Sequence, residues 1–223
     1  MKHPKGPNNE AIPPGGPTAL KIPTRTQAEA FMKEAQERNP GPWVGHSLYT
    51  ARAAEAIAAR HPGLEAEAAF VVGYLHDVGR REGVTGMRHI IDGYTFLREK
   101  GFDDAARICL THSYPTHQAQ AAWAKWDGTR AQLDFVRDYL ASIEYDAYDK
   151  LIQLCDALAL PTGFCLIEKR LIDVALRLGT NRYSVPRWKA YLGLQAELEL
   201  AIGMSIYKVL PGVVENTFGS GAL

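Results

Sequence analysis

The sequence contains few cysteines: only Cys109, Cys155 and Cys165 among 223 residues. Their number is odd, and their spacing matches neither a zinc ribbon nor a Cys-x-x-Cys pair. We therefore predict reduced, partly buried thiols, as is typical of a cytoplasmic protein. A structural zinc site built on thiolates is not expected.

The sequence also lacks a long apolar run and an excess of charge. No window of about 18 apolar residues could span a bilayer, and the N-terminal stretch MKHPKGPNNEAIPPGGPTAL lacks the apolar core of a signal peptide. The 25 Lys and Arg residues balance the 25 Asp and Glu residues, without a basic run long enough to grip a nucleic-acid duplex. We expect a cytoplasmic protein without a membrane or duplex partner, in which a local basic patch could still bind a small phosphate ester.

Residues 1–22 are rich in Pro, Gly and Asn and are predicted to form a flexible N-terminal segment. Residues 23–223 are predicted to form one domain, and the 46% hydrophobic content is enough for a core. Apolar residues recur at helical spacing between Pro and Gly stops, without alternating β-branched runs. This pattern predicts an all-α bundle of about nine or ten helices. Four of the expected helices run over about 64–78, 118–128, 163–179 and 186–209.

Six polar side chains interrupt these apolar helical stretches. They are His46, His76, Asp77, His89, His112 and Asp156. A single buried histidine is more often a hydrogen-bonded core residue than a metal ligand, but six such groups together would be costly to bury unless paired. A cation among them would remove this cost, and imidazole and carboxylate donors suit Fe, Mn, Zn or Co. Two metals become possible if one carboxylate bridges them.

The order His…His-Asp…His…His…Asp resembles the HD-domain superfamily of metal-dependent phosphohydrolases, in its dinuclear branch. The matching pieces, within 43–160, are WVGHSLYTARAAEAIA, GYLHDVGR, MRHIIDGYTFL, ICLTHSYP and KLIQLCDALAL. The resemblance implies an all-α HD-domain bundle with one or two divalent metal ions as cofactor. It implies that metal one is held by His46, His76, Asp77 and Asp156, and that metal two is held by Asp77 as a bridge with His89 and His112.

The activity implied by this resemblance is hydrolysis of a phosphoester or phosphoanhydride in a small, nucleotide-like substrate by a metal-activated hydroxide. The stretch GRREGV after the HD pair lacks the acidic pair of alarmone hydrolases, and the signatures of the cyclic-di-GMP branch are absent. The spacing from His89 to His112 looks most like the branch that hydrolyses diadenosine tetraphosphate. The substrate and the oligomeric state stay open.

Further residues are candidates for contact with substrate. Arg80 follows the HD pair and is the first choice for a phosphate clamp, because a guanidinium offers a bidentate fork. Arg81 and Arg88 are second choices. Asp77 could accept a proton from the attacking water, and His117 could protonate a leaving group.

Two tryptophans, Trp123 and Trp126, could stack on a nucleobase, although their three-residue spacing is more typical of packing. Two alternatives to hydrolysis also remain. Some HD-fold enzymes use the same six ligands to hold two irons and oxygenate small polar substrates. A non-catalytic HD module that binds a ligand is the second alternative.

Overall fold

The structure is a computed structural model that describes residues 19–122 and 124–219. Most of the segment predicted to be flexible, residues 1–18, therefore lies outside the described residues, as does Trp123. At the end of that segment, Lys21 donates from its backbone nitrogen to Asp104 Oδ2 at 2.6 Å and from its side chain to Asp103 Oδ2 at 3.0 Å. These bonds attach the start of the described chain to a helix far along the sequence.

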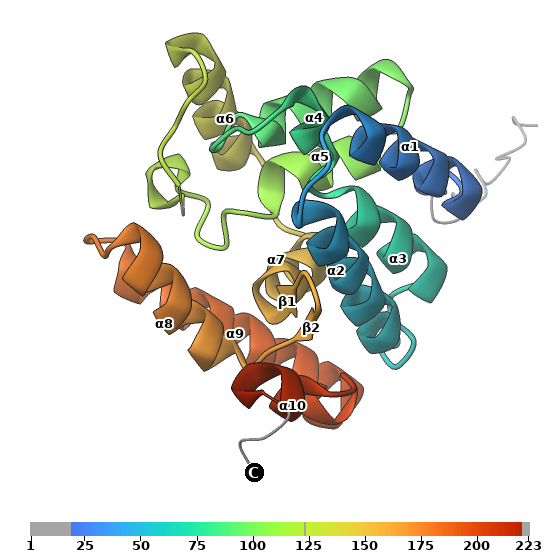
Figure 1. The fold of residues 1–223 in the computed structure, drawn as a ribbon, viewed down its shortest axis with the longest axis vertical. Coiled ribbons are helices and arrows are strands. Elements are labelled where there is room, and N and C mark those ends of the chain that lie inside the picture. The colour runs from blue at the N-terminus through green and yellow to red at the C-terminus, as the bar shows by residue number, and fades with distance from the viewer. Residues whose placement is uncertain (1–18, 123, 220–223) are drawn as a thin grey trace, which may run out of the picture.

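The described chain is mostly helical, which confirms the all-α prediction (Figure 1). Its ten α-helices are α1 (Arg25–Arg38), α2 (Trp43–Ala58), α3 (Ala66–Leu75), α4 (His89–Glu99), α5 (Asp103–Thr111), α6 (Arg130–Ser142), α7 (Ala147–Leu158), α8 (Ile167–Leu178), α9 (Ser184–Ile202) and α10 (Val213–Phe218). Three short 3-10 helices are η1 (Val78–Glu82), η2 (Ala119–Ala121) and η3 (Ile206–Lys208). The antiparallel strands β1 (Ala159–Leu160) and β2 (Gly163–Phe164) form one small hairpin.

The predicted boundaries are wrong at three places. The helix expected over 163–179 begins only at Ile167, because Gly163 and Phe164 pair with β1 across a turn that contains Pro161. The helix expected over 186–209 ends at Ile202, where Gly203 adopts a left-handed conformation with φ 70° and ψ 17°. The helix expected over 64–78 ends at Leu75, so the HD pair lies beyond it.

The helix expected over 118–128 is reduced to η2. Hydrogen bonds hold residues 124–128 in a loop. Asp127 accepts from the backbone nitrogens of Gly86 at 2.6 Å and Arg88 at 2.7 Å, and Trp126 Nε1 donates to Thr129 O at 3.1 Å. The two long-range bonds to Asp127, together with the local bond of Trp126, override the helical propensity of the alanine-rich segment.

Helices α2, α3 and α7 pack together at the centre of the molecule, and α4 and α5 extend this core (Figure 1). Small residues allow a close approach of α2 and α3. A β-carbon on Gly73 would lie 3.0 Å from Ala51 Cα and 3.3 Å from Ile152 Cδ1. All three cysteines are free thiols in the interior. Within the described residues, none of the helices has both the length and the apolar character needed for a bilayer crossing.

A buried ionic network joins α5 to α7. Asp149, which is inaccessible to solvent, accepts from Arg107 Nε at 2.9 Å and from the Thr111 hydroxyl at 2.7 Å. It also accepts from the backbone nitrogen of Asp146, completing a capping box at the start of α7. Because Thr111 directly precedes His112, this network fixes the end of α5 where that histidine lies.

Candidate metal centre

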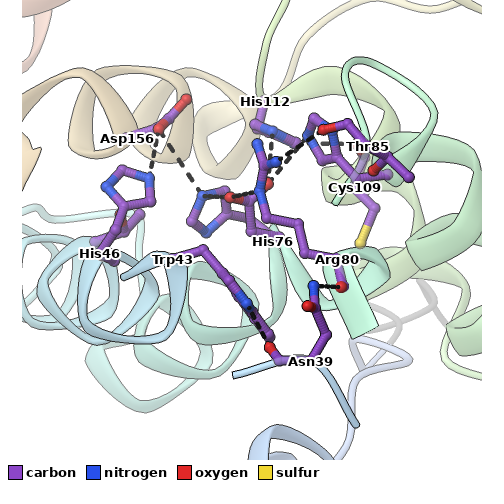
Figure 2. Close-up of polar contacts among 12 residues, drawn as sticks. Asn39, Trp43, His46, His76, Arg80, Thr85, Cys109, His112 and Asp156 are labelled. Carbon is purple, nitrogen blue, oxygen red and sulfur yellow. Dashed lines mark hydrogen bonds and ion pairs between the residues drawn. The ribbon is translucent and has the colours of Figure 1, made fainter. Parts of the chain in front are cut away.

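Six side chains from separate parts of the chain converge between the central helices. Figure 2 labels four of them, His46, His76, His112 and Asp156. His46 lies in the first turn of α2, His89 begins α4, and Asp156 lies near the end of α7. His76 and His112 are the residues that follow α3 and α5. Asp77 stands between α3 and η1 with φ −105° and ψ 11°. The structure therefore brings together all six residues selected from the sequence.

The nitrogen–oxygen distances divide the cluster into two halves. In one half, His46 Nε2 lies 2.9 Å and His76 Nε2 lies 3.9 Å from Asp156 Oδ1. In the other half, Asp77 Oδ1 lies 3.0 Å from His89 Nε2 and 3.7 Å from His112 Nε2. Asp77 Oδ2 lies 3.9 Å from His76 Nε2, so these two neighbouring residues connect the halves.

A main-chain carbonyl orients each of the four histidine rings. Nδ1 of His46 donates to Ala159 O at 3.2 Å, and Nδ1 of His76 donates to Gly73 O at 2.7 Å. Nδ1 of His89 donates to Gly86 O at 2.5 Å. The ring of His112 donates to Cys109 O at 3.0 Å. A carbonyl can only accept, so Nδ1 carries the proton in each ring and Nε2 of the neutral ring carries the lone pair. Such outer bonds are typical of metal-ligating histidines.

The turn after the HD pair depends on a glycine. A β-carbon on Gly79 would lie 1.9 Å from His89 O and 2.3 Å from Gly93 N. Any larger residue would push η1 away from the start of α4. Gly79 thus keeps Asp77 and His89 within contact distance of each other.

Burial and neighbouring charge set the protonation states of the cluster. Burial lowers the pKa of His76, and it lowers the pKa of His112 to about 3, so both rings are neutral. Burial opposes ionisation of Asp77, but the neighbouring Arg80 guanidinium outweighs it and holds the pKa of this carboxyl well below the usual range. Ionised carboxylates and neutral imidazoles are the forms that bind metals.

The polar atoms at the centre of this cluster fit a cation. His76 Nε2, Asp77 Oδ1 and His89 Nε2 are buried and make no hydrogen bond. With Nδ1 of His89 protonated, the lone pair on Nε2 faces a carboxylate oxygen at 3.0 Å, which is repulsive without a positive charge between them. The donor atoms of His46, His76 and Asp156, and those of His76, Asp77 and His112, lie within 4.8 Å of one another in two overlapping groups. One or two divalent cations held there would satisfy these atoms.

A family model of the HD domain matches residues 43–160, a little over half of the chain. The chain belongs to the HD domain family. The resemblance predicted from the sequence is therefore confirmed. Searches of curated proteins and of solved structures give no match. HD domains typically bind divalent metals and are generally metal-dependent hydrolases, and the histidine and aspartate cluster is compatible with such a metal site.

The cluster of this HD domain opens into a cavity of about 450 Å³. Trp43, Met87 and Tyr191 contribute apolar and aromatic surface to its lining. Arg80 also lines it, and its Nε donates to Asp77 Oδ2 at 2.5 Å. Asn39 donates to Arg80 O at 2.6 Å and holds this turn against the end of α1 (Figure 2). The guanidinium is thus fixed beside the candidate metal ligands.

The second choices for a phosphate clamp lie elsewhere in the HD domain. Arg81 is buried on the far side of η1, where it contacts the ring of Phe96 and donates to Glu34 at 2.5 Å. Arg88 lies outside the cavity lining and donates to Asp92 at 3.0 Å. Neither guanidinium is placed to reach a phosphoryl group at the cluster.

His117 and Trp126 are also absent from the cavity lining. The His117 ring stacks on Tyr145 with 3.6 Å between ring centroids. The Trp126 indole is bonded to the loop around Thr129. The arrangement therefore lends no support to a proton donor at His117 or a nucleobase platform at Trp126.

The wall of the cavity formed by α8 was not predicted from the sequence. Arg170, Asp173 and Arg177 line it. The available signal was their spacing, because residues three and seven positions apart share one face of a helix. That face also carries the buried Val174, so the charged residues lie next to an apolar position that packs against the rest of the chain.

Proposed function

We propose that this HD domain protein is a metal-dependent phosphohydrolase that cleaves a phosphoester or phosphoanhydride bond in a small, nucleotide-like molecule. The observation that carries the proposal is the set of unpartnered inward nitrogen and oxygen atoms of His76, Asp77 and His89, beside an arginine in the same cavity. Divalent cations at this site would activate a water molecule and offset the negative charge of a phosphoryl group.

The protein's own residues supply position and charge. The carbonyl bonds to Nδ1 direct four Nε2 atoms into one small volume. Arg80 is oriented by Asp77, and its guanidinium can contact a phosphoryl oxygen from the cavity wall. The cavity volume is in the range of small-molecule sites and fits no duplex. We expect a small phosphorylated substrate in the cytoplasm.

The test begins with protein purified without added metal, whose metal content is measured. Hydrolysis of a panel of phosphoesters is then followed with Mn²⁺, Fe²⁺, Co²⁺ or Zn²⁺. We expect Asp77→Asn to lose bound metal and activity together, because Asp77 contacts both halves of the cluster. Asp138→Asn, on the exposed face of α6, is the matched control and should retain both.

An Asp77→Asn protein with two metals and full turnover would contradict the proposal. The same donor set suits a pair of irons, so oxygen uptake is measured in parallel. Oxygen consumption coupled to product formation would replace hydrolysis by the oxygenase alternative.

A further inference from the structure

One face of α8 forms a wall of the cavity. The five positions that line it are Arg170, Asp173, Val174, Arg177 and Leu178. Their spacing of 0, 3, 4, 7 and 8 follows one stripe of a helix. Helix α8 contributes none of the six residues of the metal-ligand cluster, so this wall adds a chemically separate surface to the same cavity.

The wall carries more positive than negative charge. Arg177 Nη2 lies 3.0 Å and Arg170 Nη1 lies 3.7 Å from the same oxygen, Asp173 Oδ2. Two guanidinium groups thus share a single carboxylate, which leaves one unbalanced positive charge beside the cavity. The Arg170 side chain is only 22% exposed, so water solvates its charge incompletely.

Ion pairs along a helix surface often serve only helix stability, and they contribute little. Helix stabilisation would need only one arginine to pair with Asp173, and it would not require the ion pair to face a cavity. The outer side of the same helix already carries Glu168 and Lys169, which are exposed and do not line the cavity. The second arginine is therefore in excess of what helix pairing needs.

We propose that Arg170 and Arg177 form an anion subsite that binds a second anionic group of the substrate, remote from the phosphoryl group at the metal centre. The planar fork of each guanidinium matches phosphate and carboxylate oxygens. Asp173 keeps the two guanidiniums together before the substrate arrives. This inference rests on the proposed function for the position of the scissile phosphate, and it narrows the substrate to phosphate compounds with a second negative group.

Equilibrium binding to the protein as purified tests the subsite without turnover. Isothermal titration calorimetry compares adenosine 5′-monophosphate with adenosine 3′,5′-bisphosphate, and phenyl phosphate with 4-carboxyphenyl phosphate. We expect the additional phosphate or carboxylate to raise affinity by about tenfold in at least one pair. The pair that responds identifies the anion as phosphate or carboxylate.

The gain in affinity from the second anionic group should disappear in the double variant Arg170→Gln/Arg177→Gln. It should persist in Lys169→Gln, which removes one positive charge from the outer face of the same helix. Arg177→Gln alone is the milder variant, because its side chain is 53% exposed, and it should lose part of the gain. Equal affinities within both pairs for the unmodified protein, or a gain that survives in the double variant, would overturn the subsite. Absence of hydrolysis with an intact, arginine-dependent gain would instead refute only the phosphohydrolase function.

Discussion

Replacing Asp149 by asparagine tests the buried ionic network that joins α5 to α7. The carboxylate accepts from Arg107, Thr111 and the backbone of Asp146, and no part of its side chain is exposed. The amide keeps the shape of the side chain but removes its charge. Arg107 then lacks its ionic partner, while its bond to Glu144 O remains.

Breaking a buried ion pair costs about 3–5 kcal/mol. The lower end applies to Asp149→Asn, because Arg107 is 23% exposed and water can solvate part of its charge. A loss of about 3 kcal/mol lowers the melting temperature of a chain of this size by about 6–12 °C. The amide oxygen can still accept from Thr111 or from the Asp146 backbone, which keeps the loss from being larger.

Scanning calorimetry of the purified protein at neutral pH measures this shift. Asp134→Asn is the control, because Asp134 pairs with Arg130 and Arg137 on the exposed surface of α6 and should leave the melting temperature nearly unchanged. Equal melting temperatures for the two variants would refute the argument that burial of Asp149 makes its pairing important to stability.

Three further predictions concern the metal centre and its surroundings. Removing metal with a chelator should lower the melting temperature by about 5–11 °C. The reference is protein with free metal at 100 times its dissociation constant, where binding stabilises the fold by about 2.7 kcal/mol. The same melting curve with and without chelator would exclude a bound metal. Arg80→Ala should raise KM by about tenfold with little change in kcat, whereas Arg88→Ala should change neither, and a lower kcat with unchanged KM would show that Arg80 acts in the transition state. Gly45→Ala should destabilise by about 1–3 kcal/mol, because its β-carbon would lie 2.5 Å from Pro161 O. Gly193→Ala, where nothing lies within 4 Å, should not destabilise, and equal denaturation midpoints would contradict the steric argument.

Much of the helical fold could be predicted because its stops are local. Thr24 caps α1 together with Gln27, and helix periodicity predicts an all-α chain without knowledge of tertiary contacts. The candidate ligands could be selected because histidine and aspartate are conspicuous in apolar helical stretches. That these six residues would form one site was predicted from their HD-like order along the chain.

The remaining features depend on contacts that no local pattern encodes. The loop around Asp127 is set by hydrogen bonds to Gly86 and Arg88, about forty residues earlier. The sequence ranks Arg80 before Arg81 as a phosphate clamp but does not show where either side chain points. In the structure Arg80 lines the cavity and Arg81 contacts the ring of Phe96. The α8 wall could not be identified as part of the site before the packing of α8 against α7 was known.

The four imidazole rings of the cluster are held by peptide carbonyls and not by neighbouring acidic side chains. A point substitution cannot delete a peptide carbonyl. Most mutations around these rings should therefore leave the electron-donating strength of their Nε2 atoms unchanged. Changing it would require movement of a helix end or of the hairpin. We therefore expect substitutions that change the substrate to fall in the cavity walls, while the six residues of the cluster keep their geometry and their donor strength.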